Sequence, residues 1–212
     1  MKTICIVDYG VGNIHSAMKG IRRYTEHVVL SEDAETIRAA SALVLPGQGA
    51  FAAGMKGLRI RGLLDVVKQA AASGTPILGI CLGAQLLLEK GYEFGEWDGL
   101  GIIRGDVALF PKLQDGVKIP HMGWNSIEEP TPGKWKGTAL EGVPAGAEMY
   151  FIHSYILRPK NETDILATTE YGGHRFASVI GQGNVIGCQF HPEKSATHGL
   201  KIVENFVRMV RS

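Results

Sequence analysis

Short apolar runs alternate with amphipathic stretches along the first half of the chain. The apolar runs, each typical of a buried strand, are Ile4–Asp8, His27–Leu30, Ala42–Leu45 and Ile77–Ile80. The amphipathic stretches, which show helical spacing, are Ile14–Tyr24, Glu35–Ala39, Arg59–Ala72 and Leu82–Glu89. This alternation of strands and helices predicts a parallel sheet that carries helices on both faces.

The second half of the chain contains more strand-like runs and fewer helices. The runs are Ile102–Leu109, Glu148–Ile152, Ile165–Thr169, Ser178–Ile180 and Val185–Phe190, and a last helix is expected at Thr197–Arg211. The pattern predicts an α/β fold with an open, mostly parallel, flavodoxin-like central sheet, helices on both faces and added antiparallel strands in the second half. No repeat and no long linker divides the sequence, so residues 1–212 are expected to form a single domain.

The composition narrows the function classes to expect. A formal net charge of +1 over 212 residues gives no reason to expect a nucleic-acid or membrane partner. The apolar run near the start is too short for the core of a signal peptide. Three cysteines without a C-x-x-C pair argue against a disulfide framework or a zinc site, and the histidines show no ligand spacing. We therefore expect a cytoplasmic protein with no metal and no cofactor.

One cysteine differs from the other two in its setting. Cys5 and Cys188 lie inside apolar, strand-like runs, and most lone cysteines of that kind are core residues. Cys81 instead follows the fourth expected strand and precedes a helix, with Gly79 and Gly83 two residues away on either side. Such glycines permit the tight, strained turn that lifts a nucleophile above a sheet edge. The segment indicates a nucleophilic cysteine and thioester chemistry.

A histidine and a glutamate follow the last expected strand. An isolated histidine at a strand end usually caps a turn, but His191, like Cys81, lies at the carboxyl end of a strand, where sites gather in open α/β sheets. Pro192 favours extended geometry at His191, so that His191 and Glu193 project to the same side. Glu193 is long enough to orient the imidazole as a third group orients a catalytic base.

The order of these residues, Cys…His-x-Glu, differs from that of α/β-hydrolases, in which the acid precedes the histidine at a distance. The segments G-I-C-L-G (79–83) and Q-F-H-P-E (189–193) resemble the class I, triad-type glutamine amidotransferases. Within that family, the chain is similar to the glutaminase subunits of imidazole glycerol phosphate synthases. This similarity rests on D-Y-G-V-G-N (8–13), P-G-Q-G-A-F (46–51), P-H-M-G-W-N (120–125) and H-P-E-K-S (191–195), and it covers essentially the whole chain.

The resemblance implies roles for the catalytic residues. Cys81 would attack the side-chain amide of L-glutamine, His191 would act as base and then acid, and Glu193 would orient His191. Backbone N–H groups of Gln48 and Leu82 would hold the oxyanion, with Gln48 at a position where many relatives carry an apolar residue. The residues that would bind glutamine are Gln85, Glu93, His153, Ser154 and Tyr155. The segment before Glu93 departs from the family pattern S-E-E.

The resemblance also implies a partner. Ammonia would pass to a separate (βα)₈ cyclase subunit in a heterodimer, and glutaminase activity would depend on the nucleotide substrate bound to that partner. The residues that would face the cyclase are Met122, Trp124, Asn125 and Lys194.

Three alternatives remain open at this point. The chain could serve a different amidotransferase, act as a free-standing thiol hydrolase, or be a non-catalytic binding subunit that keeps the fold. A dinucleotide site at Gly10-Val11-Gly12 is disfavoured, because the third glycine of that fingerprint is replaced by His15. The alternatives differ in whether glutamine is hydrolysed and whether a partner is required.

Overall fold

The computed structural model describes residues 2–211. The strands are β1 (Ile4–Val7), β2 (Val28–Ser31), β3 (Ala42–Leu45), β4 (Ile77–Ile80), β5 (Lys90–Gly91), β6 (Trp97–Asp98), β7 (Gly105–Leu109), β8 (His121–Ile127), β9 (Ala147–His153), β10 (Tyr155–Pro159), β11 (Ile165–Tyr171), β12 (His174–Gln182) and β13 (Val185–Cys188). The helices are α1 (Ile14–Arg22), α2 (Ala34–Ala39), α3 (Phe51–Ile60), α4 (Leu64–Ala72), α5 (Leu82–Leu86) and α6 (Ala196–Arg211), with short 3₁₀ turns η1 (Glu162–Asp164) and η2 (Pro192–Lys194).

Parallel strands in the order β2-β1-β3-β4-β13 form one half of the main sheet. The chain order reverses between β1 and β3, as it does in flavodoxin-like sheets. Beyond β13 the sheet continues through β12, β10, β7, β5 and β6, mostly by antiparallel pairing, and β11 pairs with β12 off that path. The predicted α/β sheet with antiparallel additions is confirmed.

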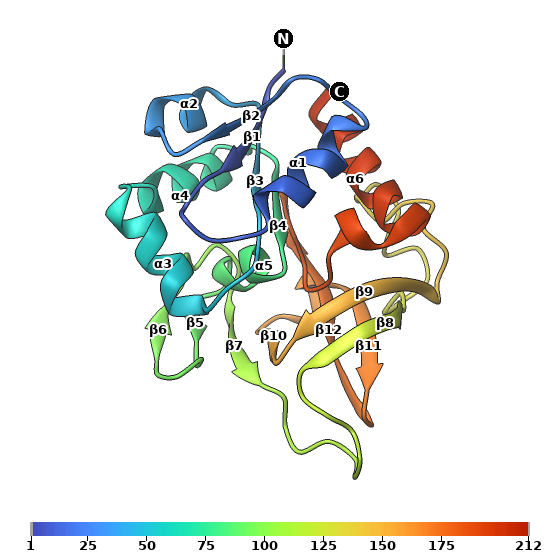
Figure 1. Ribbon diagram of the computed structural model, residues 1–212. Helices are drawn as coiled ribbons and strands as arrows, with labels where there is room; N and C mark the ends of the chain where they lie inside the picture. Colours follow the sequence, from blue (N-terminus) through green and yellow to red (C-terminus); the bar gives the residue numbers. More distant parts are fainter. Residues whose placement is uncertain (1, 212) are drawn as a thin grey trace.

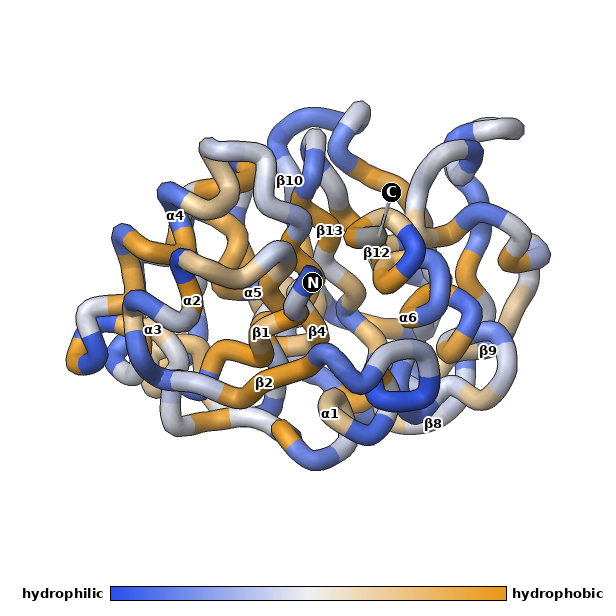
Figure 2. Tube along the Cα trace, turned by 90° about the horizontal axis from the view of Figure 1, so that it is seen from above, coloured by the Kyte–Doolittle hydropathy of each residue, from blue (hydrophilic) through white to orange (hydrophobic). Residues whose placement is uncertain are grey.

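The four inner parallel strands, β1, β3, β4 and β13, are buried on both faces, whereas the edge strand β2 is partly exposed. On β1, Ile4 and Ile6 face the core beneath α1 and α6, whereas Cys5 and Val7 face the core beneath α2, α3 and α4. Figure 1 shows helices on both sides of the sheet, and Figure 2 shows apolar residues concentrated along its central strands. Burial on both faces explains why these strands read as continuous apolar runs rather than as an alternating pattern.

The helices differ from the expectation near the middle of the chain. The prediction of a single helix over Arg59–Ala72 is wrong, because α3 ends at Ile60 and α4 begins at Leu64. Between them Gly62 adopts a φ of +67°, a left-handed conformation that ends a helix. Helix α5 also ends at Leu86 rather than at Glu89, because the chain turns into β5. None of the helices within residues 2–211 combines the length and the apolar character needed to cross a bilayer.

Four strands were not expected from the sequence, namely the two-residue strands β5 and β6 and the longer strands β8 and β10, and others have different ends. Strands β8 and β10 carry polar residues in mixed patterns that conceal their pairing, β8 with β9 and β10 with β7 and β12. Strand β7 begins at Gly105 rather than at Ile102, and β13 ends at Cys188 rather than at Phe190. The run at Ser178–Ile180 is the buried middle of the longer β12. The antiparallel half is therefore larger than its apolar runs indicate.

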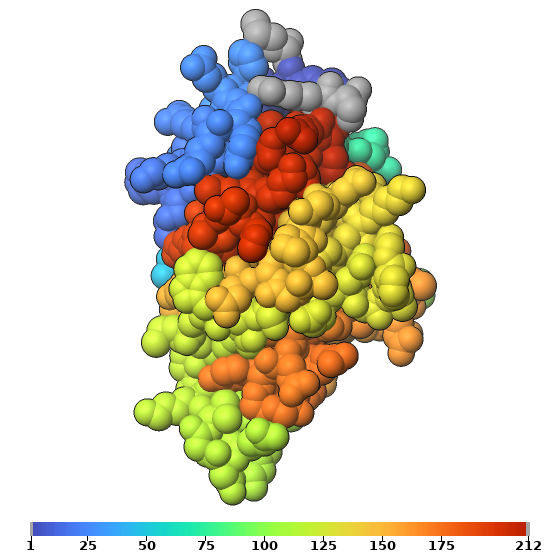
Figure 3. All heavy atoms as spheres, turned by 90° about the vertical axis from the view of Figure 1, so that its right-hand side faces the viewer, coloured from blue at the N-terminus to red at the C-terminus, as the bar shows by residue number. Residues whose placement is uncertain are grey.

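Strands β8 and β9 form a separate antiparallel ribbon. Its register pairs His121 with His153, Met122 with Ile152 and Trp124 with Tyr150. Because residues alternate across a strand, His121 faces inward and is buried, whereas Met122 and Trp124 face outward and are 64% and 51% exposed. Figure 3 shows this ribbon at the surface beside α6.

Candidate active site

Cys81 lies on a sharp turn between β4 and α5. Its backbone adopts φ +50° and ψ −106°, a left-handed conformation that is strained for any residue with a Cβ atom. The flanking glycines do not carry this strain, since neither has a positive φ. Gly83 serves close packing instead, because a Cβ there would lie 1.9 Å from the carbonyl oxygen of Leu45. The turn was correctly predicted, but the reason for Gly83 was wrong.

The segment that carries His191 lies directly beside Cys81. Strand β13 pairs in parallel with β4, and Cys188 is in register with Ile80. The N–H of Cys81 donates a hydrogen bond of 2.7 Å to the carbonyl oxygen of Cys188. Because both strands end at the same sheet edge, the thiol of Cys81 and the imidazole of His191 face the same cavity. Cys5 and Cys188 are buried core residues, as expected.

His191 and Glu193 form a buried pair. Nδ1 of His191 lies 2.9 Å from Oε1 of Glu193, and each side chain is only 2% exposed. The backbone that brings these two side chains together differs from the prediction. His191 is extended, as expected, but Pro192–Lys194 forms the 3₁₀ turn η2 rather than an extended segment. The hydroxyl of Ser195 donates to the carbonyl of His191 at 2.6 Å, which helps to hold this turn.

The surroundings of His191 shift its proton affinity. Burial alone lowers the pKa of this imidazole, but its hydrogen bonds and charge interactions with Cys81 and Glu193 outweigh that effect and raise the pKa to about 9. His191 therefore holds a second proton at neutral pH, with Glu193 behind it and the sulfur of Cys81 in front. This arrangement suits a group that must deliver a proton to a leaving amine.

A cavity of about 140 Å³ contains most of the residues singled out in the sequence. Its lining residues are Gln48, Gly49, Cys81, Leu82, Gln85, Glu93, Ile152, His153, Ser154, Tyr155 and His191. Glu193 is not among them, because it lies behind His191. The cavity is smaller than those that hold drug-sized ligands, and it fits a small substrate such as a free amino acid.

The loop between β3 and α3 presses against the turn at Cys81. A Cβ at Gly47 would lie 2.3 Å from the backbone nitrogen of Leu82, so only glycine fits there. The hydroxyl of Tyr9 donates a hydrogen bond to the carbonyl of Pro46 at the start of this loop. Gln48, which follows Gly47, and Leu82 both line the cavity, and Leu82 begins α5, where N–H groups have no intrahelical acceptor.

Two further lining residues hold the walls as well as face the cavity. Nε2 of Gln85, on α5, donates a hydrogen bond of 3.3 Å to the carbonyl oxygen of Tyr155, the first residue of β10. Oε2 of Glu93 accepts a hydrogen bond of 2.6 Å from the N–H of Phe51, the first residue of α3. One carboxylate oxygen of Glu93 is therefore engaged at the end of the Gly47 loop, which leaves the other for a ligand.

The expected partner residues lie on the outer face of the β8–β9 ribbon and next to it. Met122 and Trp124 are exposed, whereas Asn125 is half-buried and turns inward. Lys194 is half-buried on η2. Sequence reasoning missed two neighbours across the ribbon, Tyr150 and Ile152, which were visible only as part of a strand.

We call Met122, Trp124, Tyr150 and Ile152 the ribbon patch. Trp124 and Tyr150 pack edge to face with ring centroids 6.1 Å apart. Ile152 is one-third exposed, lines the cavity, and its carbonyl oxygen lies 3.9 Å from the sulfur of Cys81. The patch therefore continues into the mouth of the cavity.

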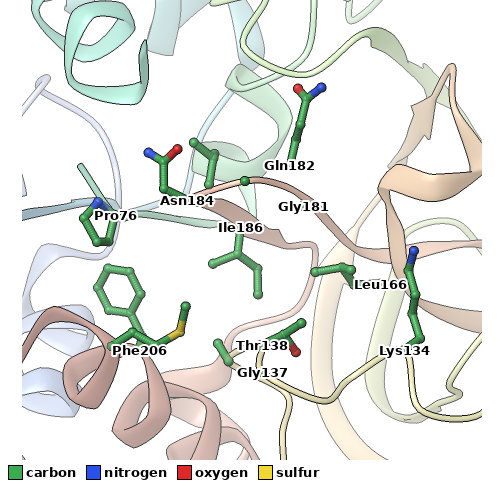
Figure 4. Close-up of a pocket in the computed structure, with 14 residues that line it drawn as sticks. Pro76, Lys134, Gly137, Thr138, Leu166, Gly181, Gln182, Asn184, Ile186 and Phe206 are labelled. Carbon is green, nitrogen blue, oxygen red and sulfur yellow. The ribbon is translucent and has the colours of Figure 1, made fainter. Parts of the chain in front are cut away.

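A second cavity, of about 290 Å³, lies between β13 and α6, and Cys81 does not line it (Figure 4). Its wall is formed by apolar side chains such as Ile186 and Phe206, together with Asn184, whose amide is bonded to backbone carbonyls of residues 71 and 75. Its one ionisable lining side chain, Lys134, donates to the carbonyl of Thr163. No group there is placed for covalent chemistry. Within residues 2–211, no cluster of three or more metal-ligating side chains occurs.

Comparison with known proteins places these features in context. The sequence profile of the glutamine amidotransferase class-I family matches residues 5–210. The chain is 43% identical over 211 residues to imidazole glycerol phosphate synthase subunit HisH of Moorella thermoacetica, covering 100% of this chain and 97% of that protein. It is 46% identical over 209 residues to the same subunit of Aquifex aeolicus, covering 98% and 97%. A crystal structure of a glutamine amidotransferase superposes with a TM-score of 0.73 at 20% identity, covering 98% and 99% of the two chains.

Proposed function

The chain belongs to the class-I glutamine amidotransferase family, and from that premise we propose that it is the glutaminase subunit of an imidazole glycerol phosphate synthase in histidine biosynthesis. It hydrolyses L-glutamine to glutamate and ammonia. The observation that carries the mechanism is the strained Cys81, which shares one small cavity with the buried His191–Glu193 pair. Residues 1–212 act as one amidotransferase domain in this proposal.

The first half-reaction forms a thioester. The sulfur of Cys81, as thiolate, attacks the side-chain carbonyl carbon of glutamine, and the carbonyl oxygen becomes an oxyanion. The N–H groups of Leu82 and Gln48 donate to that oxygen, and one preorganised donor of this kind lowers the barrier by about 3 kcal/mol. His191, held protonated by its neighbours, gives its proton to the nitrogen as the C–N bond breaks. Ammonia leaves, and the glutamyl group remains on Cys81.

The second half-reaction releases glutamate. Neutral His191 takes a proton from a water molecule, which attacks the thioester carbon. The C–S bond then breaks, so that the Cys81 thiolate and the His191 imidazolium are regenerated. Glu193 stabilises the imidazolium and keeps the ring oriented throughout both steps.

The walls of the cavity hold the substrate. The free carboxylate oxygen of Glu93 takes the α-ammonium group of glutamine, and Gln85 together with the Ser154–Tyr155 corner forms the facing wall. Opposite charge and a close fit select a free amino acid over a peptide.

The partner is a (βα)₈ cyclase subunit that receives the ammonia in a heterodimer. The ribbon patch supports this assignment because it exposes Met122 and Trp124 and continues into the mouth of the cavity. A subunit docked there covers the cavity and keeps ammonia from bulk water. Asn125 and Lys194 lie at the margin of this contact. All three cysteines are free thiols, which suits work in the reducing cytoplasm.

The test compares glutamate release by the wild-type chain and by Cys81→Ser, each with and without a cyclase subunit and its nucleotide ligand. We expect release by the wild-type chain to rise strongly in the mixture, and Cys81→Ser to fold normally but retain less than about one per cent of the rate. A variant with more activity would contradict the role of Cys81. Release unchanged by the cyclase would indicate a different amidotransferase, and hydrolysis of other amides or esters instead of glutamine would indicate a thiol hydrolase.

A further inference from the structure

A series of buried and partly buried hydrogen bonds runs from β8 to the corner between β9 and β10, at one wall of the cavity. Nε2 of His121 lies 3.3 Å from Nδ2 of Asn125, and Nδ1 of His121 lies 3.1 Å from Nε2 of His153. Nδ1 of His153 lies 2.9 Å from the carbonyl oxygen of Tyr155. Each ring nitrogen of both histidines therefore has one partner.

The donor in each of these hydrogen bonds follows from the groups at the two ends of the series, the carbonyl of Tyr155 and the amide of Asn125. The carbonyl oxygen of Tyr155 can only accept, so Nδ1 of His153 carries the hydrogen. Burial lowers the pKa of His153 to about 3 and that of His121 to about 4, so both rings are neutral. Nε2 of His153 is then an acceptor, and Nδ1 of His121 must donate to it. His121 is left with an acceptor at Nε2, which takes a hydrogen from Asn125.

The amide of Asn125 is oriented independently. Its Nδ2 donates at 2.9 Å to the carbonyl of Glu170, and its Oδ1 accepts at 2.8 Å from the N–H of Ser126. Nitrogen therefore faces His121, as the chain of donors requires. The sequence of donors runs in one direction, from Asn125 through His121 and His153 to Tyr155.

The carbonyl at the end of this series has a second donor. Nε2 of Gln85 also donates a hydrogen bond to the carbonyl oxygen of Tyr155. The series of hydrogen bonds therefore ends on the same carbonyl that anchors Gln85 in the wall of the cavity. The ring of His121 is clamped between Phe151 and Tyr171, with centroids 4.6 Å and 4.0 Å away. Such a clamped ring transmits its orientation to the next group.

We propose that His121 is a positioning residue of the glutamine cavity, which fixes the ring orientation and the Nδ1–H tautomer of His153 and thereby the carbonyl of Tyr155 that holds Gln85. Both nitrogens of His153 are used within the protein, so His153 offers the substrate only its ring carbons and takes no part in proton transfer. The proposal rests on the proposed glutaminase function only for its kinetic consequence.

The first test needs no activity. Nitrogen-15 NMR of the wild-type chain should show both His121 and His153 as neutral Nδ1–H tautomers at pH 7. A predominant Nε2–H tautomer at either histidine would overturn the proposal. Because this measurement uses the chain alone, its outcome does not depend on whether glutamine is the substrate.

The second test uses variants of His121 in the complex with the cyclase. His121→Phe keeps the stacked ring but removes the donor, whereas His121→Asn places an N–H close to the position of Nδ1. We expect His121→Phe to raise KM for glutamine about tenfold with a smaller change in kcat, because Nε2 of His153 loses its donor. His121→Asn should restore KM to within about threefold of wild type.

Substitution of the exposed His27 by Asn serves as the control. The proposal fails if His121→Phe folds, as judged by circular dichroism, and leaves both KM and the His153 resonances unchanged. It also fails if His121→Asn folds but behaves as His121→Phe does. Absence of glutamine hydrolysis in the wild-type complex would instead contradict the proposed function, with the tautomer result unaffected.

Discussion

At the scale of single residues, two histidines that line one cavity have pKa values shifted in opposite directions from the ordinary value. His191 has a carboxylate and a sulfur as neighbours, and these raise its pKa to about 9 despite burial. Burial lowers the pKa of His153 to about 3, since its neighbours are a carbonyl oxygen and another neutral ring. Opposite charges nearby thus separate a residue suited to proton transfer from one suited to positioning.

Replacement of Glu193 by Gln removes one of the charges that keep His191 protonated. In the wild-type chain the activity that requires protonated His191 is lost as pH rises through about 9. In Glu193→Gln we expect the upper limb of the pH profile of kcat/KM to move to lower pH, and kcat to fall about 10²-fold. The pH dependence of glutamate release measures both effects.

The pH dependence of folding stability provides an independent test of the interaction between His191 and Glu193. A raised pKa in the folded state stabilises the fold below the unfolded value of about 6.5, and this contribution is lost as pH rises through about 9. Glu193→Gln should therefore reduce the difference between the melting temperatures at pH 6 and pH 10. An unchanged pH profile and an unchanged difference in melting temperature would contradict the assigned pairing.

The loop that presses against the turn at Cys81 is the subject of a second prediction at this scale. Gly47→Ala places a Cβ 2.3 Å from the backbone nitrogen of Leu82, so the loop must move, and we expect kcat to fall about 10²-fold. Gln48→Ala is the matched control, because only its backbone is expected to act, and its kcat should stay within about threefold of wild type. Steady-state glutaminase assays distinguish the two variants. An equal loss of kcat in both would contradict the proposal that this loop acts through its backbone.

At the scale of elements, helix α1 packs behind the His191–Glu193 pair. A Cβ at Gly20 would lie 2.9 Å from Cβ of Glu193, so the helix meets η2 at a position where only glycine fits without displacement. The second carboxylate oxygen of Glu193 has no hydrogen-bond partner among the described residues. His191 is therefore the main polar restraint on Glu193, and the backbone of α1 sets how far back the carboxylate can lie.

Gly20→Ala should separate catalysis from stability. Alanine favours a helix over glycine by about 1 kcal/mol, which offsets part of the cost of the contact with Glu193. We expect a change in the free energy of unfolding within about 1 kcal/mol and a roughly tenfold lower kcat, measured by urea unfolding and glutaminase assay. Lys19→Ala, at an exposed position of the same helix, is the control and should leave kcat unchanged. An unaltered kcat in Gly20→Ala would show that α1 does not position Glu193.

The elements that sequence reasoning found are those whose local pattern and tertiary role agree. Strand β4 is apolar on both faces because it is buried on both faces, so its pattern reveals it. Helix α3 was missed because Gly54 and Gly57 lower its helix propensity, yet a Cβ at Gly57 would lie 1.9 Å from the carbonyl oxygen of Tyr9. There, close packing requires a residue that local propensity disfavours.

At the scale of the whole molecule, the ribbon patch and the cavity form one continuous surface. Ile152 belongs to both, since its side chain is partly exposed on β9 and it lines the cavity beside Cys81. Motifs in the sequence identified the residue types of this site, because local turns carry them. They did not reveal Ile152, whose role depends on the pairing of β8 with β9 and carries no signal of its own.

Trp124→Ala should weaken the complex with the cyclase. An exposed tryptophan beside a tyrosine is typical of interface hot spots, which cost about 2 kcal/mol when truncated. We expect roughly thirtyfold weaker binding by calorimetric titration, with activity of the isolated chain unchanged. Ile60→Ala, at an exposed site at the end of α3, is the control and should bind normally. Equal affinities for all three chains would exclude the ribbon patch as the docking surface.

The central position of β13 has a consequence for the synthesis of the protein. This strand pairs with β4 on one side and β12 on the other, yet it is the last strand to leave the ribosome. Until then β4 presents an open edge, and the nascent chain contains Cys81 but neither His191 nor Glu193. A nascent chain that has not yet added β13 therefore cannot hydrolyse glutamine, because the thiol of Cys81 waits for an imidazole that is still to be synthesised.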